Sequence, residues 1–117
     1  MPFFENEQAM YEFKDLYTID FKHVKNYFEM HFIIRDALDW PAYYGCNWDA
    51  FWDCLTDMVG RPVHIKIVGF EVLEDKFVDE AAMILETLKE FKHYSNDKYA
   101  NDIQIEVVRG ELREQLL

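Results

Sequence analysis

WPAYYGCNWDAFWDCLTD, residues 40–57, combines six aromatic side chains with three aspartates in one short stretch. Asp49, Asp53 and Asp57 are spaced four residues apart, and no lysine or arginine occurs between residues 36 and 60. If this segment is helical, the three carboxylates lie along one side of the helix, where like charges repel each other. The pattern therefore raises the question of what a small protein gains from an acidic helix face without nearby cations.

Local signals predict a helix in the second half of this stretch. Gly45 marks a loop, Asn47 is a suitable N-cap and Gly60 a suitable stop, so we expect a helix from about residue 47 to residue 59. At about 100° per residue, its apolar side chains form one stripe and its aspartates occupy the opposite side. The stripe consists of Trp48, Phe51, Leu55 and Val59, with Trp52 and Met58 at its edges.

The rest of the chain predicts an α/β fold. Asn26 and Glu29 resemble a capping box that opens a helix, which Pro41 limits. Another amphipathic helix is expected from about residue 76 or 79 to residue 94. Three segments have the β-branched, aromatic or alternating pattern of strands: residues 16–21, 63–68 and 103–108. Strands separated by helices favour parallel pairing, so we expect a small three-stranded parallel sheet packed with about three to four helices.

The length of 117 residues indicates a single domain. We expect residues 15–108 to form this domain. Residues 1–14 are an N-terminal extension of undefined structure, and residues 109–117 are a short C-terminal tail, for which a helix is one option. Cys46 and Cys54 would lie about 10 Å or more apart on a helix, beyond the roughly 4.4–6.8 Å that a disulfide spans. Both cysteines are therefore expected to be reduced thiols.

The charge balance restricts the class of partner. Lysines and arginines number 12 against 23 aspartates and glutamates, which gives a net charge of −11. Such a field repels nucleic acids and anionic membranes and attracts cationic partners. The start of the chain lacks the basic region of a secretory signal, and no run approaches the roughly 20 apolar residues of a membrane span. We expect a cytoplasmic protein that binds neither nucleic acid nor membrane directly.

Four interpretations of the aspartates compete. They can be solvated surface, metal ligands, paired catalytic carboxylates or a protein-binding face. A magnesium site at Asp49 and Asp53 lacks a visible third carboxylate. The cysteines and histidines have no zinc-finger spacing: Cys46, Cys54, His31, His64 and His93. Carboxylates one turn apart on one helix point the same way and do not flank a cleft, so we expect no enzyme, no metal and no cofactor.

Aromatic neighbours favour the protein-binding face, although a solvated surface stays open on these residues alone. Tyr43, Tyr44, Trp48 and Trp52 lie beside the unpaired aspartates, and aromatic anchors of this kind are enriched in protein interfaces. The net negative charge indicates that the partner is basic.

Residues 41–56, PAYYGCNWDAFWDCLT, resemble the barstar family, small intracellular inhibitors of barnase-type ribonucleases. The family pattern is Pro, any residue, Tyr-Tyr-Gly, any residue, Asn, an apolar residue, Asp-Ala, an apolar residue and Trp-Asp-Cys-Leu-Thr. The similarity runs from about Tyr17 to Lys92 and returns in the last strand. It implies a three-stranded parallel sheet packed with helices. It also implies that the loop and helix plug a ribonuclease active site, with carboxylates in place of RNA phosphate.

The resemblance also implies residue roles. Asp53 is the carboxylate that enters the cationic phosphate site of the enzyme. The residues that contact the enzyme around it or shape the loop are Tyr43, Gly45, Asn47, Asp49, Trp52 and Glu90. Four residues depart from the usual pattern and are expected to alter partner choice: Cys46, Trp48, Asp57 and Met58. Among them, Trp48 and Asp57 are expected to contact the partner.

Two functions follow as hypotheses. The first is an immunity-type inhibitor, itself a monomer, that binds a basic ribonuclease of the barnase type or a related toxin one-to-one. The alternative is a non-inhibitory barstar-like module that binds another basic protein or associates with itself.

Overall fold

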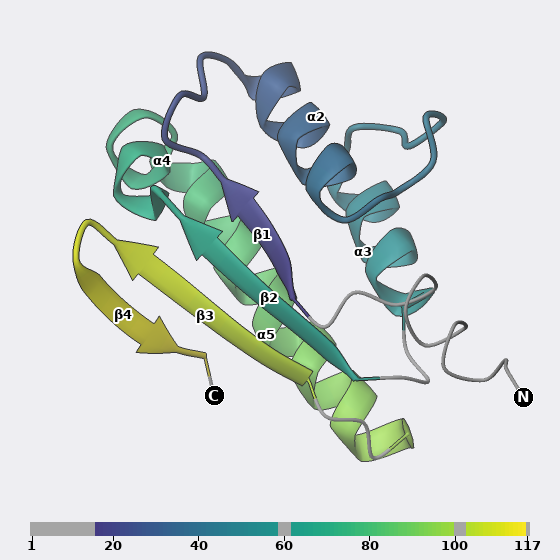
Figure 1. Cartoon of the computed structure of the whole chain (residues 1–117). Coiled ribbons are helices and arrows are strands. Elements are labelled where there is room, and N and C mark those ends of the chain that lie inside the picture. Colours follow the sequence, from purple (N-terminus) through teal and green to yellow (C-terminus); the bar gives the residue numbers. More distant parts are fainter. Residues whose placement is uncertain (1–15, 59–61, 100–102, 117) are drawn as a thin grey trace, which may run out of the picture.

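The computed structural model describes residues 16–58, 62–99 and 103–116, with the side chains of residues 96–99 excepted. Its elements in chain order are β1 (Tyr17–Asp20), α2 (Tyr27–Ala37), α3 (Trp48–Thr56), β2 (Val63–Val68), α4 (Phe70–Lys76), α5 (Val78–Tyr99), β3 (Ile103–Arg109) and β4 (Leu112–Gln115) (Figure 1). The expected α/β class is confirmed. The N-terminal extension and the predicted stop at Gly60 lie outside the described residues.

The sheet corrects the expectation of three parallel strands. Its order is β1-β2-β3-β4, with β1, β2 and β3 parallel and β4 antiparallel to β3, so over the described residues the sheet is mixed and has four strands. Gly110, at φ +60°, turns the chain so that Leu112 pairs with Arg109. The tail is therefore a strand rather than a helix. After it, Leu116 donates its N–H to the Ile105 carbonyl at 2.9 Å and is buried.

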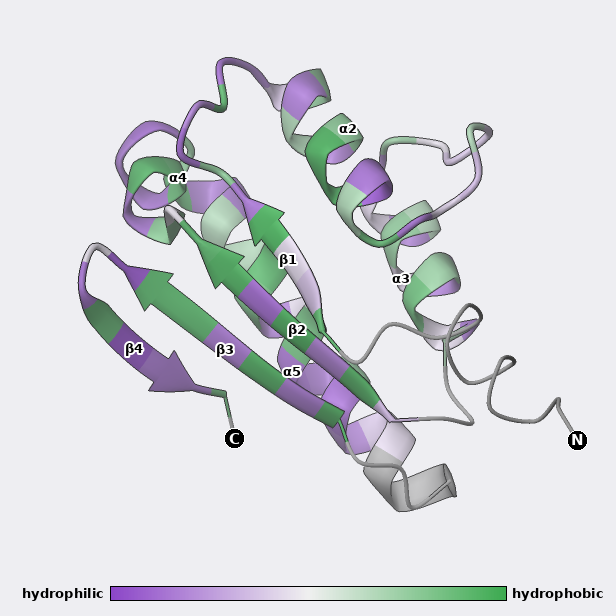
Figure 2. Ribbon diagram, in the orientation of Figure 1, coloured by the Kyte–Doolittle hydropathy of each residue, from purple (hydrophilic) through white to green (hydrophobic). Residues whose placement is uncertain are grey.

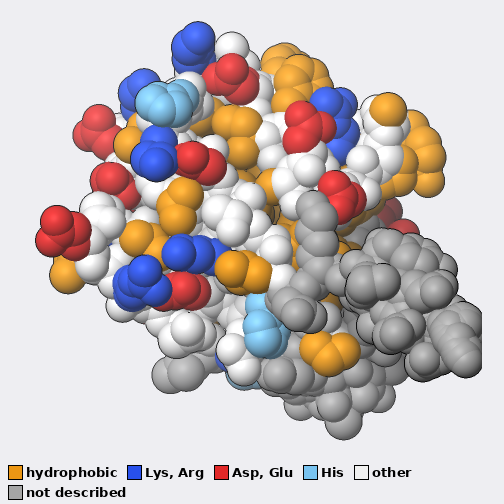
Figure 3. All heavy atoms as spheres, viewed as in Figure 1, with side chains coloured by type: hydrophobic (Ala, Val, Ile, Leu, Met, Phe, Trp, Pro, Cys, Tyr) orange, Lys and Arg blue, Asp and Glu red, His pale blue; other side chains and the backbone are white. Residues whose placement is uncertain are grey.

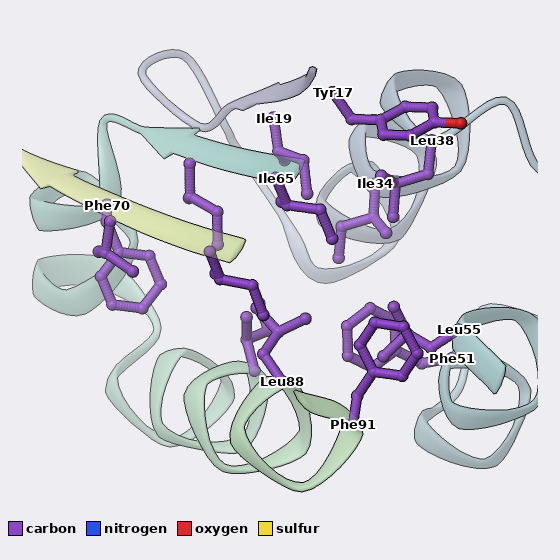
Figure 4. Close-up of a cluster of buried hydrophobic side chains, with 14 of the residues drawn as sticks. Tyr17, Ile19, Ile34, Leu38, Phe51, Leu55, Ile65, Phe70, Leu88 and Phe91 are labelled. Atoms are coloured by element: carbon purple, nitrogen blue, oxygen red, sulfur yellow. The ribbon is translucent and has the colours of Figure 1, made fainter. Parts of the chain in front are cut away.

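One face of the sheet is buried. Alternate residues of the three parallel strands are buried, and Figure 2 shows the matching alternation of hydrophobic and hydrophilic positions. In Figure 1, α5 runs behind the sheet, α4 lies near the arrowhead end of β2, and α2 lies alongside β1. The labelled core residues in Figure 4 come from β1, β2, each described helix and the C-cap of α2: Tyr17, Ile19, Ile34, Leu38, Phe51, Leu55, Ile65, Phe70, Leu88 and Phe91. None of these is more than 5% exposed.

The first helix starts where its cap predicts. Asn26 Oδ1 accepts from the Glu29 N–H at 2.8 Å, and Glu29 Oε1 accepts from the Lys25 N–H at 2.6 Å, one residue before the cap. Asparagine satisfies a donor that has no partner inside the helix. The helix ends at Ala37, well before Pro41.

The structure contains a helix that the sequence did not predict, α4, which lies before the helix expected from about residue 76 or 79 to residue 94. Helix α4 follows β2 after a single residue, Gly69, and α5 begins at Val78 and continues to Tyr99, past the expected end. Gly69 has φ +69°, a conformation that L side chains rarely adopt. A Cβ there would lie 2.7 Å from the backbone N and 2.9 Å from the Cα of Lys22. The sharp connection and the close approach of Lys22 both require glycine, and they bury Phe70 at the start of α4.

We expect Gly69→Ala to lower the free energy of unfolding by more than about 2 kcal/mol, because left-handed strain adds to a clash with backbone. Gly110→Ala is the matched control. Its φ is also positive, but a Cβ there meets nothing within 4 Å, so only about 1 kcal/mol should be lost. Urea unfolding of both variants measures the difference. Equal losses would show that the approach of Lys22 does not constrain the fold.

Candidate partner-binding face

The acidic helix α3 is built on its cap. Asn47 Oδ1 accepts from the Ala50 N–H at 2.8 Å, while its Nδ2 donates to the Gly45 carbonyl at 3.2 Å. The predicted N-cap is confirmed. The helix ends earlier than expected, at Thr56, with Asp57 as its C-cap. The Thr56 hydroxyl lies 3.0 Å from both the Trp52 and Asp53 carbonyls, and the Asp57 N–H donates to the Asp53 carbonyl at 3.2 Å.

The loop before α3 is strained at unexpected positions. Asp39 and Cys46 have φ of 59° and 56°, although neither is glycine. Gly45 does not have a positive φ. It matters because its missing side chain leaves space for neighbouring atoms. A Cβ on it would lie 3.3 Å from Asn47 Nδ2 and 3.4 Å from the Ala50 Cβ. Glycine therefore leaves room for the side chain that caps the helix.

A buried histidine on α2 contacts the loop before α3 from its core side. His31 of α2 is fully buried, and its Nδ1 lies 2.7 Å from the hydroxyl of Tyr44, itself 6% exposed. The His31 ring also packs against Tyr27 and Trp48, with centroids 4.8 and 4.9 Å away. Burial lowers the pKa of His31 to about 4 and raises the pKa of Tyr44. Both groups are therefore neutral near pH 7.

An aromatic cluster extends this support under α3. The Trp40 ring packs against Tyr44 at 5.2 Å and against Phe51 at 5.7 Å, and Trp48 packs against Phe51 at 5.6 Å. Trp48 is only half-buried. In the structure, Trp48 packs against His31 and Phe51 and so supports the loop and helix. The partner contact expected from the sequence would be an additional role of the same residue. Neither Trp40 nor His31 was expected to support the loop, because their contacts come from tertiary packing.

The outer side of α3 carries charge without compensation. Asp49, Asp53 and Asp57 are exposed, and none forms an ion pair or side-chain hydrogen bond with a described residue. Asp49 lies in the first turn, where the helix dipole favours an acid, but the last turn contains no basic residue. Burial, together with the charges of Asp57 and Asp53, raises the pKa of the Cys54 thiol.

Helix α5 joins this face through one aromatic contact. The Trp52 and Tyr94 rings meet edge to face, with centroids 5.6 Å apart. Glu90 is exposed and lies four residues before Tyr94 on α5, so both residues share one side of that helix. Tyr43, in the loop, is 86% exposed. The sequence did not predict the Tyr94 contact either, because nothing in the local pattern of Tyr94 indicates which helix it meets.

The arrangement favours binding rather than chemistry. Among the described residues, no group of three His, Cys, Asp or Glu side chains is placed to hold a metal ion. Cys46 and Cys54 are free cysteines. In the described part of the chain, no helix is both long and apolar enough to cross a membrane. A preformed surface of carboxylates and aromatic rings is suited to a cationic protein surface.

The fold and this face define a small α/β domain with an acidic surface on α3. A family model described as "Barstar (barnase inhibitor)" matches residues 15–107, and the chain belongs to the barstar family. A relative from Bacillus subtilis (strain 168), "Putative ribonuclease inhibitor YrdF", is 35% identical over 81 residues, which cover 69% of this chain and 89% of the relative. Barstar family proteins are inhibitors and not enzymes, so the expectation of a non-enzyme is confirmed. Family and relative together support a ribonuclease-inhibitor-like role, with a ribonuclease as the general kind of partner.

The His31 environment predicts a pH dependence of stability. The pKa of His31 is about 4 in the folded protein and 6.5 as an ordinary value, so only the unfolded chain takes up this proton between those pH values. The free energy of unfolding therefore falls as pH drops from about 6.5 to 4, by on the order of 2–3 kcal/mol from this group.

The measurement is urea unfolding of wild type and His31→Asn across this pH range. The stability of wild type relative to the variant should decline toward acid. His23→Asn, at an exposed histidine, is the matched control and should follow wild type. Parallel curves for wild type and His31→Asn would contradict the inferred burial effect.

Neutralising the aspartates of α3 should change the free energy of unfolding differently at the two ends of the helix. Asp53→Asn and Asp57→Asn should each raise the free energy of unfolding by roughly 0.3–1 kcal/mol, since each removes repulsion and an unfavourable charge at the helix end. Asp49→Asn should give no such gain, because the same charge is favourable at the helix start. Unfolding at low and high salt measures this, and the gains should shrink with salt. An equal gain at all three positions would rule out the dipole contribution.

Proposed function

We propose that this protein inhibits a basic ribonuclease by binding it one-to-one and covering its active site with residues 40–47 and α3. The observation that carries this proposal is the row of exposed carboxylates, Asp49, Asp53 and Asp57, that no described cation neutralises. A ribonuclease must hold RNA phosphate, so its active site presents cationic side chains. Carboxylates on α3 would occupy those positions in place of phosphate.

Each residue of the face then has a role. Asp53 enters the phosphate site, while Tyr43, Asp49, Trp52 and Glu90 contact the enzyme around it. Gly45 and Asn47 hold the loop and start the helix. Trp48 braces the loop against His31 and reaches the partner with its exposed part, and Asp57 extends the acidic row by one turn. The hydrogen bonds and ring contacts described above support these positions, and the family pattern supports the roles.

The rigidity of the face favours tight binding. Association costs free energy when side chains and loops become ordered, and a face that is already ordered avoids much of that cost. Here the helix cap, the His31–Tyr44 hydrogen bond and the Trp52–Tyr94 contact order the face in the free protein. Pairing with cations would also relieve the repulsion along α3 and its unfavourable charge at the helix end.

The charge of −11 favours fast encounter with a basic enzyme. Long-range attraction raises the association rate and makes it fall with ionic strength. Rapid, reversible inhibition of this kind fits an immunity-type role in the cytoplasm, where a cell protects its own RNA from a ribonuclease that it makes or meets.

The decisive experiment is RNA cleavage by a panel of barnase-type ribonucleases and related toxins, with the protein added from equimolar amounts up to micromolar excess. We expect at least one enzyme to be inhibited at equimolar amounts. Asp53→Ala should weaken inhibition by about 30-fold to 1,000-fold, as expected for removing one partner of a buried charge pair, and Asp57→Ala by less than about tenfold.

Two outcomes would contradict the proposal. If no enzyme in the panel is slowed even at low salt, the ribonuclease role is wrong. If Asp53→Ala and Asp57→Ala weaken inhibition equally, the assignment of the phosphate site to Asp53 is wrong.

A further inference from the structure

Among the described residues, the large aromatic side chains that are exposed gather on one region. Seven large hydrophobic side chains are exposed among the described residues: Leu16, Phe28, Phe32, Tyr43, Val78, Met83 and Leu112. The three aromatic ones are Phe28 (60% exposed), Phe32 (42%) and Tyr43 (86%), and they all lie on α2 or the loop that follows it. Tyr43 belongs to the proposed inhibitory face. Phe28 and Phe32 do not, and both are exposed on α2.

Phe28 and Phe32 form an ordered pair, which we call the aromatic flank. They lie one helical turn apart, so their side chains share the outer side of α2. The Arg35 guanidinium lies 5.0 Å from the Phe32 ring centroid and donates from Nε to Asp36 at 2.9 Å. The Phe28 ring packs edge-on against Tyr27 at 5.5 Å. The flank is thus held in place without being covered.

Ring contacts connect the flank to the proposed inhibitory face. Tyr27 packs against both Phe28 and His31, and His31 packs against Trp48, the first residue of α3. In Figure 3, hydrophobic side chains gather at the upper right, over α2 and over the loop that leads into α3, with charged side chains between them. A partner seated on α3 and its loop would therefore meet α2 beside them.

We propose that the aromatic flank is a second contact area, made by aromatic rings rather than carboxylates, for the same basic ribonuclease, reached next to its active site. This inference rests on the proposed function. The ribonuclease surface that fits the flank carries a lysine or arginine over an apolar area, because aromatic rings attract cations. Arg35 over Phe32 shows that the flank accepts a guanidinium.

The charge of the chain decides between this occupant and a second copy of the protein. Two copies that met through the flank would bring two acidic α3 faces close together, each on a chain of net charge −11. That repulsion opposes self-association, whereas a basic enzyme gains attraction from the same charges.

The flank and the acidic face should act on different rate constants. Surface charges mainly set the association rate and its salt dependence, whereas packed apolar groups mainly set the dissociation rate. An aromatic contact area can therefore be recognised by slower dissociation without a change in the salt dependence of association.

The test uses the full chain with the double substitution Phe28→Gln and Phe32→Gln, since glutamine is a good helix former. The matched control is Leu112→Gln, at a hydrophobic residue that is 74% exposed on β4, away from α2 (Figure 1). Circular dichroism and urea unfolding establish that both variants are folded.

Binding kinetics with an inhibited ribonuclease are measured at two salt concentrations. We expect the double variant to dissociate about tenfold faster or more, with association within about twofold of wild type and the same salt dependence. The control should match wild type.

Unchanged dissociation of the double variant, in a wild type that inhibits, would overturn the flank and leave the proposed function standing. A wild type that inhibits no ribonuclease would overturn both. Sedimentation provides the remaining outcome: a wild-type dimer that the double variant abolishes would show that the flank binds a second copy, which also overturns the inference.

Discussion

The hydrogen bond between His31 and Tyr44 is the constraint on which the proposed binding face depends. It joins α2 to a loop that contains two left-handed non-glycine residues, Asp39 and Cys46, and such a loop does not hold its shape alone. Both partners are buried, so breaking the bond would leave polar groups unsatisfied in an apolar site. The rings of Tyr27, Trp40 and Trp48 pack against the pair. The loop is therefore fixed from the core side, and its outer side remains available.

This arrangement separates stability from binding within a single short helix. The inner side of α3 supplies Phe51 and Leu55 to the core, and the N-cap provides the local start. The outer side carries Asp53 and Asp57 at positions where the helix dipole and mutual repulsion disfavour them. Burying the core side chains of α3 stabilises the fold by more than the roughly 0.3–1 kcal/mol that each unfavourable aspartate costs. The fold therefore tolerates the acidic row.

Local signals were reliable where a residue acts on its own neighbours. Asn26 and Asn47 start helices through side-chain bonds three residues ahead, and the alternation in Val63–Val68 reports a strand with one buried face. Strand β4 was missed because Leu112–Gln115 is exposed throughout, so it has no alternation to detect. Strand β4 forms because the turn at Gly110 brings it alongside β3, with which it pairs.

The candidate site divides in the same way. The acidic row and the exposed Tyr43 are visible in the sequence as a spacing and a composition. The strain at Cys46, the buried His31 and the Tyr94 contact with Trp52 arise from elements that meet only after folding. Even Gly45, correctly placed in the loop, acts by leaving space for Asn47 rather than by adopting a left-handed conformation.

The anchor of the loop also has a consequence for the order of folding. His31 and Tyr44 are 13 residues apart, whereas the parallel pairs β1–β2 and β2–β3 join strands separated by long crossovers, as in Tyr17 with Ile65 and Ile65 with Ile105. Closing a short loop loses less chain entropy than closing a long one, and contacts of low sequence separation form sooner. The contact that shapes the binding loop is thus among the cheapest in the protein to make, and it can form before the sheet beneath it is complete.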